Sequence, residues 1–250
     1  MCVSTGVGRS LLLVVNRELA RRVTAEGVGT AFLVAVVVGS GIAAQRLSPG
    51  QVGLELLINA TVTGAGLVAL ILAFGPVSGG HFNPVVTLAD RILGGISTVD
   101  AVAYAVAQVI GACVGAIVAN LMFSLPAVTI STHTRSSSGL WLGEFVATFG
   151  LVLVILGVVR SGRASVAAFA VGGYIAAAYW FTSSTSFANP AVTIGRTLTD
   201  TFAGIAPSSA PAFIVMQLAG GLAAVALARF LNPVLPADSV VVPHESSGSE

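Results

Sequence analysis

Long apolar stretches alternate with short polar connections along most of the chain. Six of them are close to the roughly 20 residues that a helix needs to cross a bilayer, and they lie at 25–45, 52–75, 100–124, 140–159, 164–184 and 209–231. Two further apolar segments, 85–93 and 191–205, are too short to cross. Because irregular backbone at membrane depth must be buried in protein or line a watery cavity, both are expected to be re-entrant half-helices. The pattern predicts an all-α membrane protein with six transmembrane helices and two re-entrant half-helices.

Both short segments begin with the same polar signal. The first reads Asn-Pro-Val-Val-Thr from Asn83, and the second reads Asn-Pro-Ala-Val-Thr from Asn189. Asn caps a helix because its side-chain oxygen accepts from a backbone N–H of the first turn, and Pro at the first helical position loses no hydrogen bond. Two surface helices that share a cap by chance would explain one copy, but two copies between apolar segments favour a functional pair. Their positive dipole ends would then face each other across a narrow path, with both Asn amides pointing into it.

The two halves of the chain repeat. The segment from Glu26 is similar to the one from Glu144, and the segment around Gln108 is similar to the one around Gln217. Three crossings per half is an odd number, so the second half (140–231) must be inserted upside down relative to the first (24–124), which predicts a functional site at the midplane. Buried Glu residues in a membrane are functional candidates. A supporting role is favoured here, because the non-helical backbone before each Asn-Pro leaves N–H groups that the two Glu and two Gln can satisfy.

Composition excludes several classes of function. Of 250 residues, 55% are hydrophobic and 8% are charged, whereas a soluble domain carries roughly 25% charged residues. The net charge of +1 gives no indication of nucleic-acid binding. Cys2 and Cys113 lie far apart, which argues against a disulfide or a metal site. The three His residues (His81, His133 and His244) have no metal-ligand spacing, and no catalytic set is evident, so neither an enzyme nor a cofactor is expected.

The distribution of Arg predicts the orientation in the membrane. The chain has 11 Arg and no Lys; eight Arg lie on one side of the predicted spans, and Arg46, Arg135 and Arg196 lie on the other. The side with eight Arg is expected to be the cytoplasm, with both termini inside. Residues 1–23 are expected to be a cytoplasmic N-terminal segment, and residues 232–250, which are rich in Pro and Ser, a disordered C-terminal tail.

The inverted halves and the paired motifs together resemble the aquaporin (major intrinsic protein) family over about residues 24–231. The resemblance rests on Ser-Gly-Gly-His-Phe-Asn-Pro at 78–84 and Asn-Pro-Ala at 189–191. It implies a multi-pass channel in a bacterial inner membrane that passes water or small uncharged solutes, usually as a homotetramer with one pore per subunit. It also implies a central motif of Asn83, Pro84, Val85, Asn189, Pro190 and Ala191, and two ladders of pore-lining carbonyls from Gly79, Gly80, His81, Ser184, Thr185 and Ser186.

The departures from the family pattern bear on the solute. The four filter positions that the family implies are all occupied by small residues, namely Thr63, Ala177, Ser186 and Val192. Most members have Arg where this chain has Val192, and Arg196, one helical turn later, is expected to lie too far along to replace it. Unless Phe187, Tyr179 or Trp180 enters the path, the resemblance predicts a wide, arginine-less filter that passes glycerol-type polyols. The stretch 187–193 further resembles members encoded with bacterial arsenic-resistance genes, which implies arsenite or methylated arsenicals.

Two other readings remain open at this point. An ion-coupled secondary transporter can also be built from inverted repeats with broken helices. Such a transporter usually needs a midplane acid or a carbonyl cation site, whereas this chain places two amides under positive helix ends. A closed, adhesive or purely structural member of the family is the third reading, and measurable permeability would exclude it.

Overall fold

The computed structural model describes residues 6–231 of the chain. The described residues form only helices and connections, and six of the helices are long and apolar enough to cross a membrane. The helices are α1 (Gly6–Leu47), α2 (Val52–Ser78), α3 (Pro84–Leu93), α4 (Thr98–Met122), α5 (Ser138–Arg160), η1 (Ala164–Val166), α6 (Ala167–Phe181), α7 (Pro190–Gly195), η2 (Arg196–Leu198) and α8 (Ala210–Leu231). The six predicted spans and the two predicted half-helices, α3 and α7, are all present.

Two boundaries differ from the sequence-based prediction. Helix α1 begins at Gly6, so the described part of the predicted N-terminal segment continues into the first span without a break. The predicted tail, 232–250, lies outside the described residues. The second half-helix is shorter than the predicted 191–205: α7 ends at Gly195 and is followed by one 3-10 turn. It ends there because the chain then folds back, and the N–H of Ile205 donates to the carbonyl oxygen of Arg196 at 3.3 Å.

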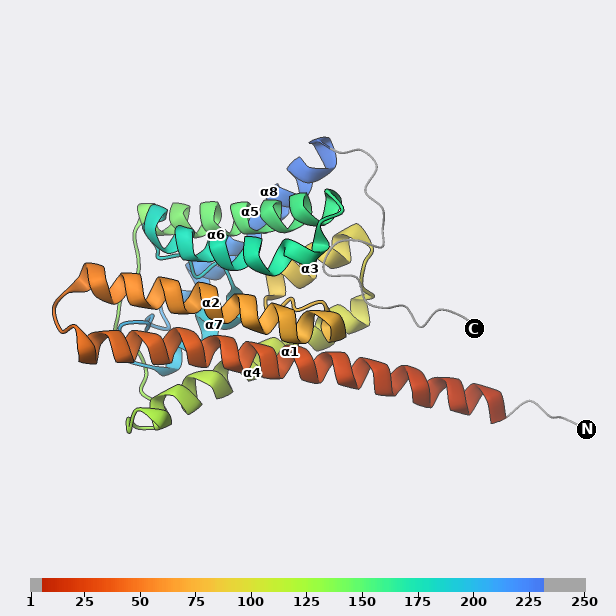
Figure 1. Cartoon of the computed structure of the whole chain (residues 1–250), viewed down its shortest axis with the longest axis horizontal. Coiled ribbons are helices and arrows are strands. Elements are labelled where there is room, and N and C mark those ends of the chain that lie inside the picture. The colour runs from red at the N-terminus through yellow and green to blue at the C-terminus, as the bar shows by residue number, and fades with distance from the viewer. Residues whose placement is uncertain (1–5, 232–250) are drawn as a thin grey trace, which may run out of the picture.

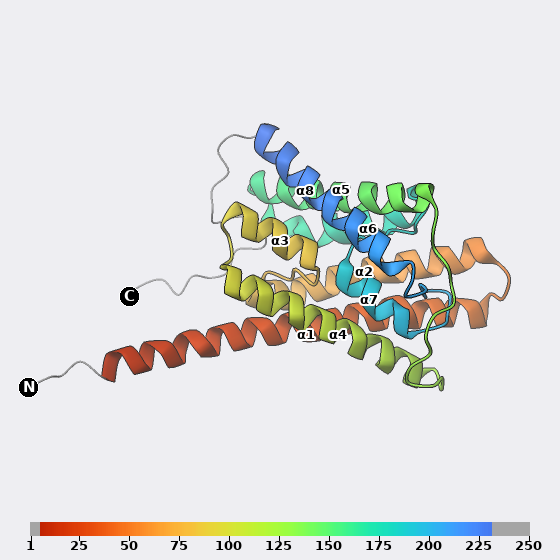
Figure 2. The same cartoon turned by 180° about the vertical axis from the view of Figure 1, so that it is seen from behind.

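The helices pack as two similar halves. Helix α1 packs on α2 and α4, and α5 packs in the same way on α6 and α8, while α2 and α6 join the halves. Figures 1 and 2 show the long helices side by side around the two short ones. The α2–α6 contact is very close, because a Cβ on Gly64 would lie 2.8 Å from the carbonyl oxygen of Gly172. Small residues permit this approach of helix backbones, as in many membrane helix pairs.

The two half-helices enter the bundle from opposite faces. Helix α3 contacts α4 and α8, and α7 contacts the same two helices, so each half-helix packs against a span of the other half. Figure 2 shows α3 and α7 on opposite sides of the centre of the bundle. We call the end of the bundle that holds α3 the α3 face and the end that holds α7 the α7 face. This arrangement directs the N-terminus of each half-helix toward the midplane.

Candidate functional site

The starts of the two half-helices meet and are hydrogen-bonded to each other. The side-chain amide Nδ2 of Asn83 donates to the carbonyl oxygen of Ala188 at 2.7 Å, and that of Asn189 donates to the carbonyl oxygen of Phe82 at 2.7 Å. Each Asn side-chain oxygen meanwhile caps its own helix by accepting from the N–H two residues later, at 2.9 Å in both cases. Pro84 and Pro190 occupy the first helical positions. An amide group carries two N–H bonds, so each Asn keeps a second one for the cavity that both residues line.

A buried Glu holds the loop before the first motif. The carboxylate of Glu26 accepts from the backbone N–H groups of His81 at 2.9 Å and Phe82 at 2.7 Å. It also accepts from the Ser78 hydroxyl at 2.6 Å and from Nε2 of Gln108 at 2.7 Å. Phe82 has a φ of 47°, in the left-handed region that a non-glycine residue rarely adopts. The carboxylate therefore stabilises a loop conformation that leaves its N–H groups without helical partners.

The second half repeats this support. The carboxylate of Glu144 accepts from the backbone N–H groups of Phe187 and Ala188, both at 2.9 Å, and from Nε2 of Gln217 at 2.5 Å. Ala188 has a φ of 48°, close to that of Phe82 in the first loop. Gln217 also donates to the hydroxyl of Thr193 at 2.9 Å, which ties the spanning helix α8 to the half-helix α7. The structure thus places Glu26, Glu144, Gln108 and Gln217 where they support the two loops.

A cavity runs along the two loops and past the meeting point of the half-helices. Gly79, Gly80 and His81 line it, as the family resemblance implies for the first loop. In the second loop, the residues that line it are Ser186, Phe187 and Ala188. Ser184 and Thr185 are not among the residues that line this cavity, and their place in the carbonyl ladder stays a prediction. Ser184 is fully buried behind the loop, where its hydroxyl accepts from the N–H of Ser186 at 3.2 Å.

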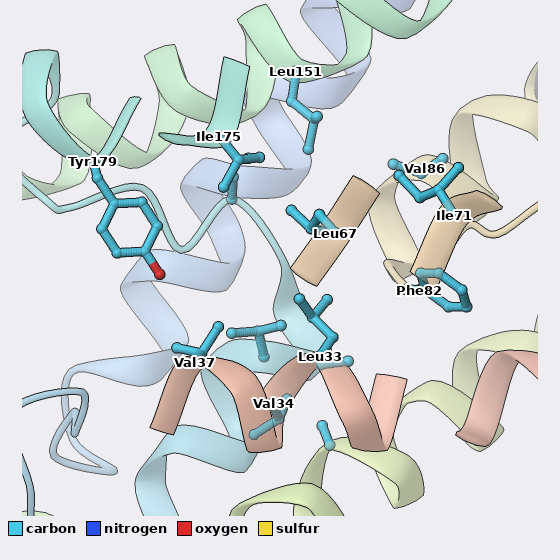
Figure 3. Close-up of a cluster of buried hydrophobic side chains, with 14 of the residues drawn as sticks. Leu33, Val34, Val37, Leu67, Ile71, Phe82, Val86, Leu151, Ile175 and Tyr179 are labelled. Atoms are coloured by element: carbon cyan, nitrogen blue, oxygen red, sulfur yellow. The ribbon is translucent and has the colours of Figure 1, made fainter. Parts of the chain in front are cut away.

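The opposite wall of the cavity is aliphatic. Figure 3 shows Leu67, Ile175, Leu33 and Val37 turned toward a common space, with the hydroxyl of Tyr179 directed toward Val37. Further apolar side chains continue this wall toward the α3 face, namely Ile71, Leu151, Ile155, Val159, Ala167 and Val171. Aliphatic side chains cannot hydrogen-bond, so polar molecules beside this wall must find their partners on the loop side or at the hydroxyls of Thr63 and Tyr179.

Three of the four predicted filter residues line the cavity, and one does not. Thr63, Ser186 and Val192 line the cavity. Ala177 lies on the exposed outer side of α6 instead, so its assignment to the filter is wrong. Successive helical residues are rotated by about 100°, and Tyr179 therefore points inward where Ala177 points outward. The hydroxyls of Tyr179 and Thr63 lie 3.3 Å apart across the α2–α6 contact.

Arg196 also lines the cavity, so the expectation of an arginine-less passage is wrong. Its side chain is 2% exposed, and its Nε donates to the carbonyl oxygen of Ala203. The carbon at the centre of its guanidinium lies 3.3 Å from the centroid of the Phe187 ring. Arg196 follows Val192 by four residues, so both lie on one face of the turn. The side chain of Arg196 is long enough to reach the cavity from there. The spacing of one helical turn is evident in the sequence, but it does not show how far the long side chain reaches.

Phe187 is held by several groups at the α7 face. The guanidinium carbon of Arg135, from the connection between α4 and α5, lies 5.2 Å from the Phe187 ring centroid. Phe213 makes an edge contact with the same ring at 5.2 Å. Arg135 is itself fixed, because its Nε donates to the carbonyl oxygen of Gly204 at 2.9 Å. Phe187, Tyr179 and Arg196 all line the cavity, whereas Trp180 is 51% exposed on the outside.

Comparison with known proteins is consistent with this geometry. A family model described as major intrinsic protein matches residues 14–183. The chain is 49% identical over 220 residues to the aquaglyceroporin AqpS of Rhizobium meliloti (strain 1021), covering 88% of this chain and 94% of that protein. It is 31% identical over 241 residues to the probable aquaporin AqpM of Archaeoglobus fulgidus, covering 85% and 97%. The X-ray structure of the aquaglyceroporin from Plasmodium falciparum matches the fold with a TM-score of 0.68 at 22% identity, covering 86% of this chain and 96% of that one.

Proposed function

The chain belongs to the major intrinsic protein family, and on that premise we propose that it is a passive transmembrane channel for water and small uncharged solutes of the glycerol type. Proteins of this family are channels, not enzymes. The observation that carries the proposal is the meeting of the two half-helix starts at a cavity that Asn83 and Asn189 both line.

The midplane suits neutral oxygen-bearing solutes. Each Asn offers one amide N–H to the cavity, and a water or hydroxyl oxygen accepts such a bond. The N-terminus of each half-helix is equivalent to roughly +0.5 elementary charge, so two facing ends repel inorganic cations. The aliphatic wall opposite removes hydrogen-bonding partners on that side and keeps the solutes in a file along the loops.

The residues that line the α7 half of the cavity favour polyols, and not water alone, as solutes. Its lining includes the hydroxyls of Thr63, Tyr179 and Ser186 and the guanidinium of Arg196. A relative with 49% identity is named an aquaglyceroporin. Arsenite in its neutral trihydroxy form presents the same kind of hydroxyl groups as glycerol, so it and methylated arsenicals belong to the proposed solute class. The similarity of residues 187–193 to arsenic-resistance members supports this extension.

The proposal includes the orientation of the channel in the membrane, its location and its assembly. We place both termini in the cytoplasm, because the positive-inside rule favours the side with eight of the 11 Arg. The α7 face then opens to the outside. Membrane lipid covers the apolar outer surface, and the family resemblance supports a homotetramer in a bacterial inner membrane. An ion-coupled transporter is disfavoured, because the midplane offers amide donors and positive helix ends to an incoming cation.

Permeability of proteoliposomes tests the proposal. Vesicles containing the purified protein should swell faster than empty vesicles in gradients of glycerol and of arsenite, and should shrink faster in a non-permeant osmolyte. The glycerol flux should persist after a protonophore collapses the proton gradient. Flux that stops with the gradient would indicate coupled transport, and water flux without glycerol flux would restrict the channel to water.

A further inference from the structure

A second hollow lies on the outer surface of the bundle, between α1 and α2 near the α3 face. It is an open groove, and none of the described residues lines both this groove and the central cavity. Figure 1 shows α1 and α2 side by side, with the first part of α1 continuing beyond the end of α2. The residues that the argument uses are Arg17, Arg21, Ala25 and Val28 on the α1 side and Phe74 and Val77 on the α2 side.

The groove changes from cationic to apolar along α1. Arg17, Arg21 and Val28 are four and seven residues apart, so they lie on one side of the helix in successive turns. At 1.5 Å per residue, Val28 lies about 10 Å further along the axis than Arg21. The first predicted span begins at residue 25. The two Arg therefore lie at the polar boundary of the span, and Val28 lies within its apolar part.

The cationic end of the groove is not neutralised within the protein. Arg17 takes part in no ion pair within the described residues. Arg21 pairs with Glu18 at 2.9 Å, but these side chains are 68% and 51% exposed, and exposed pairs are weak. Arg22 is turned toward α4, where it donates to Asp100 at 2.9 Å. Two Arg and one Glu thus leave a net positive charge at this end.

The apolar end of the groove has a preformed wall. The ring of Phe74 makes an edge contact with the ring of Phe82, whose centroid lies 6.2 Å away. Phe82 belongs to the first loop of the central cavity and is itself 1% exposed. Ala25 on the opposite side of the groove is 6% exposed, so the α1 side is also packed. A wall that is fixed beforehand lowers the cost of binding a ligand against it.

We propose that this groove binds one anionic phospholipid, with its phosphate between the guanidinium groups of Arg17 and Arg21 and one acyl chain against Val28, Phe74 and Val77. Basic residues beside a span attract the anionic lipids of the cytoplasmic leaflet, and the α3 face is the side that we place in the cytoplasm. A soluble phosphate would pair with the two Arg and leave the apolar walls uncovered, whereas a lipid satisfies both ends. The site lies outside the solute path and goes beyond the proposed channel function.

A second copy of the chain is the competing occupant of the groove. It would have to offer a carboxylate to Arg17. Among the described acidic residues at the α3 face, Glu26 and Asp90 are buried, and Glu18 and Asp100 already pair with Arg residues of α1. The described part of a second copy therefore has no unpaired acid for this end, whereas an anionic lipid supplies one.

Native mass spectrometry of the purified protein in detergent tests the site, because it counts bound lipids and reports the oligomeric mass in one measurement. The wild type should bind dioleoylphosphatidylglycerol more tightly than the zwitterionic dioleoylphosphatidylcholine. Arg17→Gln and Arg21→Gln should each weaken binding of the anionic lipid about fivefold, the contribution of one basic residue beside a membrane. The double variant should weaken it by about twentyfold to thirtyfold, and binding of the zwitterionic lipid should not change.

Matched variants separate the groove from the general charge and greasiness of the surface. Arg160→Gln removes an exposed guanidinium at the end of α5 that does not line the groove, and it should bind the anionic lipid as the wild type does. Val77→Trp should fill the apolar end and weaken binding at least about fivefold. Leu72→Trp places the same ring at a 51% exposed position of α2 outside the groove, and it should have no effect.

The proposal is overturned if the two lipids bind equally, if millimolar inorganic phosphate displaces the anionic lipid, or if Arg160→Gln weakens binding as much as Arg17→Gln. A change of oligomeric mass in Arg17→Gln or Val77→Trp, with no lipid bound to the wild type, would assign the groove to a second copy instead. These measurements involve no flux. Failure of the channel proposal would appear separately, as wild-type vesicles without glycerol flux above that of empty vesicles.

Discussion

Gly64 in α2 and Gly172 in α6 lie in such close contact that a Cβ on either would come within 2.8 Å of the other's carbonyl oxygen. This contact joins the two inverted halves, and it lies beside the Thr63–Tyr179 hydroxyl pair that lines the cavity. The spacing of the two halves, and hence the width of the passage between them, depends on these two residues having no side chain.

Gly64→Ala should therefore destabilise the protein. The added methyl group must push α2 and α6 apart, and overpacking of this kind costs about 1–3 kcal/mol. A lower midpoint of thermal unfolding in detergent would show it. Gly173→Ala is the matched control, because a Cβ at that neighbouring position in α6 meets nothing within 4 Å. Equal stability of the two variants would contradict the close contact.

Glu144→Gln should disturb the second loop. The carboxylate accepts from two backbone N–H groups and from Gln217, whereas an amide offers one acceptor oxygen and turns an N–H toward these donors. Leaving a buried donor unsatisfied costs about 1–3 kcal/mol. We expect a lower unfolding midpoint together with reduced water permeability. Glu18→Gln, at an exposed position in α1, should change neither property.

Two Trp variants test which side of helix α6 faces the cavity. Ile175→Trp should block water and glycerol flux, because Ile175 lines the cavity. Ala177→Trp, two residues further along, places the same ring on the exposed side of the helix and should leave both fluxes unchanged. Stopped-flow light scattering on vesicles of each variant distinguishes them. Blocked flux in Ala177→Trp with open flux in Ile175→Trp would show that α6 faces the passage with its other side.

Val192→Arg should restrict the passage further. Val192 and Arg196 both line the cavity, so the variant carries two guanidinium groups along the same passage. The added bulk should reduce glycerol permeability by at least about tenfold, roughly the effect of 1.4 kcal/mol on a barrier, and water permeability much less. Val192→Leu, which adds bulk without charge, separates the two contributions. Unchanged glycerol flux in Val192→Arg would mean that the constriction lies elsewhere.

The contact between Asp200 and Thr132 at the α7 face should depend on pH. The backbone N–H of Thr132 donates to the Asp200 carboxylate at 2.8 Å, and this bond lowers the pKa of Asp200 below its ordinary value. The stabilisation is therefore fully present above the ordinary pKa of Asp and is lost as pH falls through the lower folded value. Amide exchange at Thr132 should show its protection vanishing in acid, and Asp200→Asn should weaken the protection while removing its pH dependence.

The sequence by itself determined the number of spans, the inversion of the halves and the pairing of the two Asn-Pro starts. These features depend on local signals, namely apolar length, a helix cap and an N-terminal Pro. It also indicated the support by Glu26 and Glu144, because a non-helical loop at membrane depth requires acceptors for its N–H groups.

Only the tertiary structure decided which side chains surround the passage. Packing of α6 against α2 turns Tyr179 inward and Ala177 outward. The return of the chain after α7 brings the carbonyl oxygen of Ala203 to Arg196 and directs the guanidinium over Phe187. The rotation of a helix about its axis depends on contacts between segments that are far apart in the chain. The position that a long side chain reaches depends on the path of a loop that no local motif specifies. A helix cap or a membrane span, by contrast, is specified within one segment.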